Sequence, residues 1–416
     1  MKTPPSIASL ALISSTLFFA TTSFGELARA GDPPAAPRSD PEVDVVEVGG
    51  AVRSLPRVTL VPADAGAVAE TKELARLVAA TGLFAATTLA PGASTAGLVV
   101  RVSSSADGEK RRLEAVTTDA KDRVHRRAVS YGASTRALDV ARLADAVLAD
   151  LSGERSHLSG TLLFVDAKTP GERRVRVMLG SGAPLRDASH EGVLARGADV
   201  GPGGVVHWAA AAPGEPLRIF AEGRAEPLAV KVPGYLQSVA FAPDGRAAVI
   251  AGDGDGGSLW VGFLEGTMKK RELGPGIALH PAFSSSGGLA YAAGPPTGPL
   301  AVYVDGKRVS GGGEWATAPS FCPESGKARI AYMVKGGDAW TTVIRELGGD
   351  AHVVGPGAHP ACSPDGRTVA IARPRRGNDA GGVWLIGEDG IAAHRVHEGE
   401  VVDLRWAPGP SLPPEG

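Results

Sequence analysis

Beyond its first thirty residues, the sequence has no apolar run that approaches the ~18 residues needed to cross a membrane. It also lacks an excess of charge of either sign. Lys and Arg number 43, Asp and Glu number 45, and the formal net charge is -2. A balanced charge gives no electrostatic footprint for nucleic acid and no attraction to an anionic membrane surface. We therefore expect no nucleic-acid partner and no direct membrane span.

The N-terminus is the one apolar exception. Residues 1–30 contain Lys2, a mostly apolar stretch from Ile7 and the sequence Ala28-Arg29-Ala30. This order is typical of a secretory signal peptide cleaved near Ala30, and its apolar core is too short to span a bilayer. No cysteine stands at the cleavage point to accept a lipid. Residues 31–42 are rich in proline and small or charged side chains, which predicts a disordered tail.

Cysteine is scarce, with only Cys322 and Cys362 in the chain. Because an exported protein meets an oxidising compartment, a disulfide between them is one interpretation. The spacing argues against it: Cys322 stands one residue before Pro323, whereas Cys362 stands two before Pro364. This offset places the two side chains on opposite faces of equivalent strands, which favours two buried thiols.

Residues 43–153 carry the helix signals of the chain and predict a small α/β domain. Strands are expected at 43–48, 57–62, 97–104, 110–118 and 123–132, and helices at 67–84 and 135–152. The first helix should turn Leu74, Leu77 and Val78 inward. The second should bury Leu143, Val147 and Leu151 and end at Gly153.

After the second helix the helical pattern vanishes and one phrase recurs. "SVAFAPDGRAAVIAG" (238–252) and "HPACSPDGRTVAIA" (359–372) each place a Pro-Asp-Gly turn between two alternating apolar segments, which predicts a β-hairpin. Related turns stand at 202, 243, 285, 323, 364 and 408, giving steps of 41, 42, 38, 41 and 44 residues. A repeat of this length is typical of a four-stranded propeller blade.

The fold class that follows is a small α/β N-terminal domain before an all-β six-bladed propeller at 158–410. The last apolar strand, 401–408, has nothing after it to complete a blade, whereas the segment from Gly160 begins with strands that lack an innermost partner. We therefore expect the C-terminal strand to complete the first blade and close the ring.

The segments that lead into the innermost strands should form a rim where a partner binds, because propellers usually bind ligands at that end of the ring. Aromatic residues there are favoured anchors for protein partners. The predicted partner-binding rim consists of Tyr235, Leu236, Gln237, Leu279, His280, Glu314, Trp315, His359, Val401 and Asp403.

Enzyme signatures are lacking. The sequence has no Gly-x-Ser-x-Gly nucleophile elbow, and "GSGAP" (180–184) does not fit that pattern. "GDGDGGS" (252–258) places Asp253 and Asp255 among glycines, as in a calcium loop, but lacks the remaining oxygen ligands and the closing Glu. We interpret it as a Gly-rich turn. No catalytic residue is predicted.

Two histidines of the rim invite a metal hypothesis. His280 and His359 both precede a proline at the entrance to an innermost strand, and Asp403 would be a third ligand. A stagger of two blades should place the histidines across the mouth of the ring rather than side by side. We therefore interpret them as part of a partner-facing or solvated rim, with no metal and no cofactor.

The order of these features resembles the TolB family, the periplasmic component of the Tol-Pal envelope system. The junction "ARLADAVLADLSGERSHLSGTLLFVDAK" (141–168) is similar to the family's helix, linker and first propeller strand, and Trp406-Ala407-Pro408 is similar to its final strand. The resemblance covers about 43–410. It implies a periplasmic location for this chain.

The resemblance also implies a role. It suggests a monomeric, non-catalytic scaffold that binds a Pal-like outer-membrane lipoprotein at the propeller mouth and an inner-membrane Tol protein at its other end. Such a scaffold would maintain outer-membrane integrity and support cell division. The alternative is a propeller enzyme or small-ligand receptor of lactonase-like or lyase-like type that uses the funnel of the ring.

Overall fold

The computed structural model describes residues 55–407 except 155, 170, 213, 253–255, 274–275, 324–326 and 378–380. The predicted signal peptide (1–30), the predicted tail (31–42), the strand expected at 43–48 and the last predicted propeller residues (408–410) lie outside the described residues. So do Asp253 and Asp255 of the calcium-like loop. Each of these remains a prediction.

The first described part of the chain is a five-stranded sheet with two helices. Its strands are β1 (Arg57–Pro62), β2 (Ala85–Thr88), β3 (Leu98–Asp107), β4 (Lys110–Thr118) and β5 (Val124–Tyr131), in the order β2-β1-β3-β4-β5. The helices are α1 (Val68–Ala80) and α2 (Arg136–Ser152). β1 runs parallel to β2 and β3, whereas β3, β4 and β5 are antiparallel. The helices and strands expected at 57–152 are thus present.

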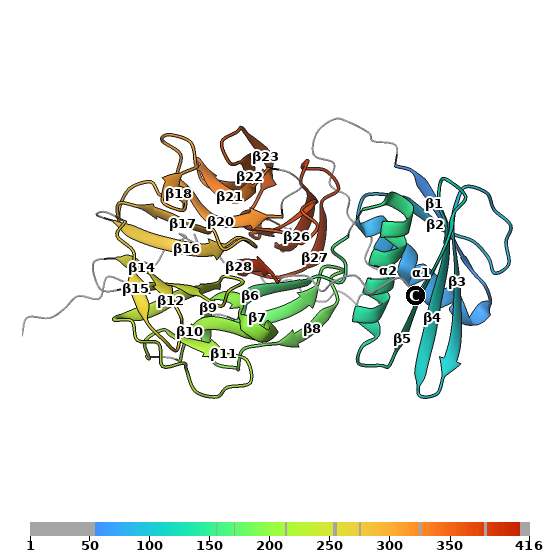
Figure 1. The fold of residues 1–416 in the computed structure, drawn as a ribbon, viewed down its shortest axis with the longest axis horizontal. Coiled ribbons are helices and arrows are strands. Elements are labelled where there is room, and N and C mark those ends of the chain that lie inside the picture. Colours follow the sequence, from blue (N-terminus) through green and yellow to red (C-terminus); the bar gives the residue numbers. More distant parts are fainter. Residues whose placement is uncertain are drawn as a thin grey trace, which may run out of the picture. The chain divides into compact units, whose positions relative to one another are not determined.

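The apolar stripes of the two helices explain this arrangement, since both helices lie on the same face of the sheet (Figure 1). Leu74, Leu77 and Val78 of α1 and Leu143 and Val147 of α2 are buried in one cluster with residues of the sheet. Leu151 is half-buried against the same cluster. α2 ends at Gly153, whose φ of 73° is the left-handed conformation that favours glycine at a helix end.

The remainder of the described chain is built of short strands. They are β6 (Thr161–Thr169), β7 (Glu172–Leu179), β8 (Pro184–Asp187), β9 (Leu194–Val200), β10 (Val206–Ala211), β11 (Arg218–Ala221), β12 (Tyr235–Phe241), β13 (Ala247–Gly252), β14 (Gly257–Gly262), β15 (Met268–Lys270), β16 (Ile277–Phe283), β17 (Leu289–Gly294), β18 (Ala301–Val304), β19 (Lys307–Arg308), β20 (Ala316–Cys322), β21 (Arg329–Gly336), β22 (Ala339–Glu346), β23 (Ala351–Pro356), β24 (Ala358–Cys362), β25 (Thr368–Arg373), β26 (Gly382–Gly387), β27 (His394–His397) and β28 (Val401–Trp406). Among the described residues, β12 to β27 form four consecutive four-stranded sheets. These small sheets are arranged as in a β-propeller (Figure 1).

The strands β6 to β11 form one sheet together with the C-terminal strand β28, and this sheet has two groups of strands. β28, β6, β7 and β8 form the first group, and β9, β10 and β11 form the second. A single residue pair, Arg173 with Leu194, joins them. Within the described residues the second group therefore has three strands, where the sequence predicted four.

The chain closes as the sequence predicted. β28 pairs antiparallel with β6, so that Leu404 lies opposite Phe164 and Trp406 opposite Leu162. The first strands of the successive groups also contact one another in order: β9 with β12, then β16, β20, β24 and β28, and β28 with β9 again. The C-terminal strand is therefore the closing member of a continuous ring.

Cys322 and Cys362 form a disulfide, with their Cα atoms 5.0 Å apart. The sequence argument for two free thiols was wrong. It compared the faces of two separate strands as if they belonged to one sheet, whereas Cys322 ends β20 and Cys362 ends β24 in the neighbouring sheet. Because β20 and β24 contact each other, side chains from different faces meet between the two sheets.

Candidate partner-binding face

The first strand of each sheet carries an irregularity where it enters the ring. In β16, β20 and β24 the pairing register shifts around His280-Pro281, Ala318-Pro319 and His359-Pro360. The residue before each proline has a positive φ, 49° for His280, 50° for Ala318 and 49° for His359. Positive φ is uncommon for residues other than glycine. Such bulges re-aim side chains, which here turn toward the centre of the ring.

The histidine side chains meet inside the ring. The His280 and His359 rings lie edge to face with their centroids 5.7 Å apart. His280 Nδ1 is 2.9 Å from the hydroxyl of Thr317, and His359 Nδ1 is 3.8 Å from a carboxylate oxygen of Asp403. The expectation that the two histidines lie apart across the mouth was therefore wrong, because the bulges point both rings inward.

Two further charged residues complete this group, which we call the central cluster: His280, His359, Asp403, Asp199 and Arg405. Asp199 accepts a hydrogen bond from the Phe241 N–H at 2.8 Å. Arg405 of β28 donates to the Pro281 carbonyl of β16 at 3.2 Å and so reaches across the ring. Sequence reasoning missed both residues. Asp199 stands two residues after the unpaired Gly197 of β9, and Arg405 stands three residues after the unpaired Val402 of β28, so no common spacing in the sequence identified them.

Burial sets the protonation of the central cluster. Burial, helped by the neighbouring His359, lowers the pKa of His280 to about 3, against the opposing charge of Asp403. Burial also lowers the pKa of His359. Burial raises the pKa of Asp199 to about 6, with Arg405 opposing. Both imidazoles are therefore neutral at pH 7. Among the described residues, His359 Nδ1, Asp403 Oδ1 and Arg405 Nε are buried atoms without a hydrogen-bond partner, so the polar groups of the cluster are only partly satisfied.

The other predicted rim residues differ in exposure. Tyr235 is 41% exposed, and its ring covers Gly252, where any side chain would collide with it. Leu236 is only 3% exposed and packs in the apolar core, so this member of the predicted rim has no surface to offer a partner. Gln237, Leu279 and Val401 are half-buried.

Trp315 is the centre of a depression of about 640 Å³ on this face. The indole is 39% exposed, and the Lys335 ammonium lies 4.7 Å from its ring centroid, within cation–π range. Glu314 beside it accepts a hydrogen bond from the Gly311 N–H at 2.6 Å. The remaining walls come from Pro299, Gly312, Gly313, Val334 and Gly337. The predicted pair Glu314 and Trp315 thus stands at a concave, partly aromatic surface.

Comparison with known proteins bears on the fold. No family model and no curated protein matches the chain. Among solved structures, the crystal structure of TolB from Acinetobacter baumannii matches 88% of this chain and 98% of its own, with a TM-score of 0.72 and 16% sequence identity. The chain has a TolB-like fold. The resemblance identified from the junction and the repeats is confirmed at the level of structure.

More distant structures share less. A putative gluconolactonase covers 56% of this chain and 91% of its own at a TM-score of 0.35 and 15% identity. A virginiamycin B lyase from Staphylococcus aureus covers 70% and 91% at a TM-score of 0.29 and 8% identity. Such low scores support no inference about activity.

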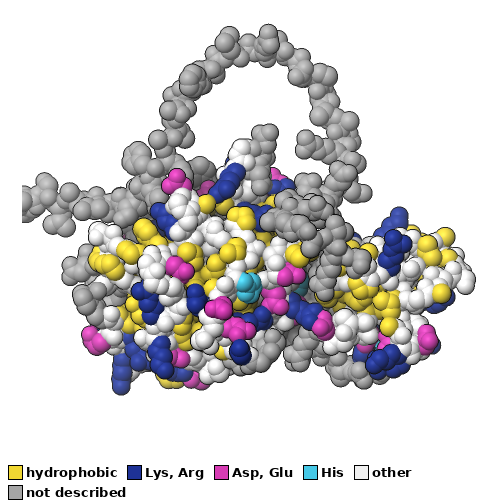
Figure 2. All heavy atoms as spheres, turned by 90° about the horizontal axis from the view of Figure 1, so that it is seen from above, with side chains coloured by type: hydrophobic (Ala, Val, Ile, Leu, Met, Phe, Trp, Pro, Cys, Tyr) yellow, Lys and Arg dark blue, Asp and Glu magenta, His cyan; other side chains and the backbone are white. Residues whose placement is uncertain are grey.

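Three further observations concern the described residues. On the face drawn in Figure 2, hydrophobic, acidic and basic side chains are interspersed over the described residues. Among the residues that the structure describes, no group of three or more His, Cys, Asp or Glu side chains is placed to hold a metal ion. Neither described helix is long and apolar enough to span a bilayer.

Proposed function

We propose that this protein is a non-catalytic periplasmic scaffold of the Tol-Pal type. In this proposal an N-terminal signal peptide exports it, residues 43–153 form an α/β domain, and residues 158–410 form a six-bladed propeller. The propeller rim binds a Pal-like outer-membrane lipoprotein, and the other end of the molecule binds an inner-membrane Tol protein. The complex supports outer-membrane integrity and cell division.

One observation carries the proposal: a TolB-like fold presents an exposed aromatic depression on the predicted partner face. Large aromatic side chains that are pre-positioned on a rigid strand bind partners at low entropic cost. Trp315 directly precedes β20, and its carbonyl accepts a hydrogen bond from the Lys335 N–H at 2.9 Å. The anchor is therefore held by backbone pairing rather than by a free loop.

The depression also indicates the chemistry of the bound segment. Within the part of the chain that the structure describes, no ion pair engages Lys335. A partner segment that places an apolar side chain on Trp315 and a carboxylate at Lys335 would use both groups. The adjoining Gly312 and Gly313 would carry no side chain to obstruct its backbone.

Calorimetric titration with a purified Pal-like lipoprotein tests the proposal. Trp315→Ala should weaken binding by about 30-fold, because a central aromatic anchor contributes ~2 kcal/mol or more. Tyr235→Ala should weaken it as well. Phe263→Ala is the matched control, because Phe263 is 53% exposed in the connection between β14 and β15 of the sheet that contains Tyr235, but lies beside the Gly245 turn.

The outcomes separate clearly. Loss of affinity in both rim variants, with normal affinity for Phe263→Ala, supports the rim as the binding site. Wild-type affinity in both correctly folded rim variants would remove the rim from the mechanism. Absence of any binding by the wild-type protein would overturn the Tol-Pal assignment itself.

A further inference from the structure

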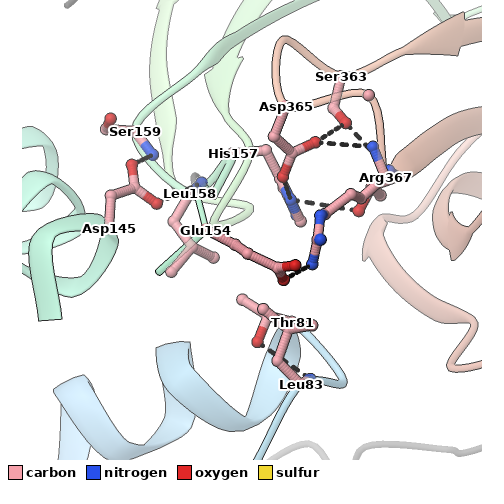
Figure 3. Close-up of polar contacts among 12 residues, drawn as sticks. Thr81, Leu83, Asp145, Glu154, His157, Leu158, Ser159, Ser363, Asp365 and Arg367 are labelled. Atoms are coloured by element: carbon pink, nitrogen blue, oxygen red, sulfur yellow. Dashed lines mark hydrogen bonds and ion pairs between the residues drawn. The ribbon is translucent and has the colours of Figure 1, made fainter. Parts of the chain in front are cut away.

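The linker between α2 and β6 is held by hydrogen bonds to α2. Asp145 of α2 is buried, and its two carboxylate oxygens accept hydrogen bonds from Leu158 N–H at 3.0 Å and Ser159 N–H at 2.8 Å (Figure 3). The Leu158 side chain packs in the same apolar cluster as the two helices. His157, the residue before Leu158, makes its contacts with β25 and the turn before it instead.

His157 attaches the linker to the turn between β24 and β25. Its side chain is only 3% exposed, and its Nδ1 lies 3.2 Å from an Asp365 carboxylate oxygen and 3.2 Å from the Thr368 hydroxyl. Asp365 is itself held in place, because its second oxygen accepts hydrogen bonds from the Ser363 hydroxyl and from the Arg367 N–H. The imidazole therefore meets a fixed carboxylate rather than a mobile one (Figure 3).

The charged groups around His157 come from every element packed against it. Asp145 of α2 and Asp365 of the turn are acidic, while His394 of β27 carries a positive charge only when protonated. Glu154 of the linker and Arg367 of the turn form an ion pair beside them. The indole of Trp406 in β28 meets the imidazole edge to face, with the centroids 5.9 Å apart.

The balance of these groups favours a protonated imidazole. Burial lowers the pKa of His157, but the hydrogen bond and charge of Asp365, with the charge of Asp145, outweigh it and raise the pKa above its usual 6.5. The same contact outweighs burial at Asp365 and lowers the pKa of that carboxyl. Burial and the charge of His157 lower the pKa of His394 to about 4, so His394 is neutral and does not compete.

We propose that His157 is a pH-sensitive latch that joins the linker after α2 to the Ser363–Thr368 turn. Because the latched state has the higher pKa, the latch is fully engaged below pH 6.5 and weakens as the pH rises through that higher value. Loss of the proton removes the ion pair with Asp365 and releases the linker from the turn. The inference goes beyond partner binding and does not depend on which protein binds the rim.

Hydrogen exchange of the full-length protein from pH 5.5 to 8.5 tests the latch. Protection of the Leu158 and Ser159 amides should fall as the pH rises, up to about tenfold for each unit by which latching raises the imidazole pKa. His157→Gln keeps a hydrogen-bond donor but does not titrate, so its protection relative to wild type should change with pH. Asp365→Asn should move the transition to lower pH.

A matched control separates the latch from general effects of pH. Asp244 stands in the same Pro-Asp-Gly turn of another sheet and pairs with Arg246 at 2.7 Å, so Asp244→Asn should exchange like wild type at the linker. If His157→Gln does not fold, an NMR titration of the histidines in wild type and Asp365→Asn still decides. A His157 pKa below 6.5, or linker protection with the same pH dependence in wild type and variants, overturns the proposal.

Discussion

Leu404→Ala should weaken the closure of the ring more than any other single truncation of β28. Leu404 is fully buried, pairs with Phe164 across the β28–β6 register, and packs in a cluster with Leu385 of the neighbouring sheet. The change removes three carbon atoms, worth ~2.4 kcal/mol at ~0.8 kcal/mol each, and leaves a cavity that adds to the loss. We therefore expect the free energy of unfolding to fall by about 3 kcal/mol.

Leu259→Ala is the matched control for closure. Leu259 is also fully buried, but it lies in β14, whose partners β13 and β15 are its neighbours along the chain. Both variants should lose similar stability in urea unfolding, because both remove the same atoms from a dry core. Only Leu404→Ala should speed hydrogen exchange in β28 and β6, because only there does the sheet join the two ends of the ring.

Two results would refute this reasoning. A loss below about 1 kcal/mol for Leu404→Ala would mean that the site relaxes without a cavity. If hydrogen exchange in β28 is equally fast in Leu404→Ala and Leu259→Ala, the pairing of β28 with β6 opens no more easily than the other sheets of the ring. Deleting residues 401–416 is the larger perturbation of the same contact, and it should lower the melting temperature by many degrees.

Two further predictions concern the core. Val147→Asp should lower the free energy of unfolding by several kcal/mol and raise protease sensitivity. Val147 is fully buried between α2 and the sheet, where a carboxylate would have no partner. Unchanged urea unfolding would show that this helix face tolerates a charge. Replacing Cys322 and Cys362 together by Ser should cost up to ~4 kcal/mol, since the bridge closes a loop with a sequence separation of 40. A reductant should reproduce that loss in the wild-type protein but not in the double variant.

The fold was largely predictable because its signals are local and repeated. A turn recurs about every 40 residues and marks the hairpins. Each turn contains residues whose conformational preferences are local and do not depend on distant neighbours. Counting the strands predicted that the C-terminal strand completes the first blade, and β28 does pair with β6. The two helices were predictable from Leu74, Leu77 and Val147 because an apolar stripe at helical spacing has only one way to be buried.

The candidate site was harder to predict because its geometry depends on contacts between sheets. The sequence placed His280, His359 and Asp403 on the rim of the ring and did not predict the 5.7 Å contact between the two imidazole rings, which accompanies the positive φ values of both histidines. Leu236 was misplaced for a related reason. It follows the exposed Tyr235 on β12, and successive side chains on a strand face opposite ways, so a range of rim residues cannot all be exposed.

The junction shows where sequence reasoning stops. Asp244 and Asp365 occupy the same position in the same turn motif, and the local sequences differ only in small side chains, with Ser363 and Thr368 where the other turn has Ala242 and Ala247. Asp244 pairs with an arginine of its own turn, whereas Asp365 meets His157, more than 200 positions away. The role of a repeated residue is therefore set by the side chain that the ring brings to it. This is why the same Asp→Asn change should be silent in one sheet and should move the pH response of the linker in another.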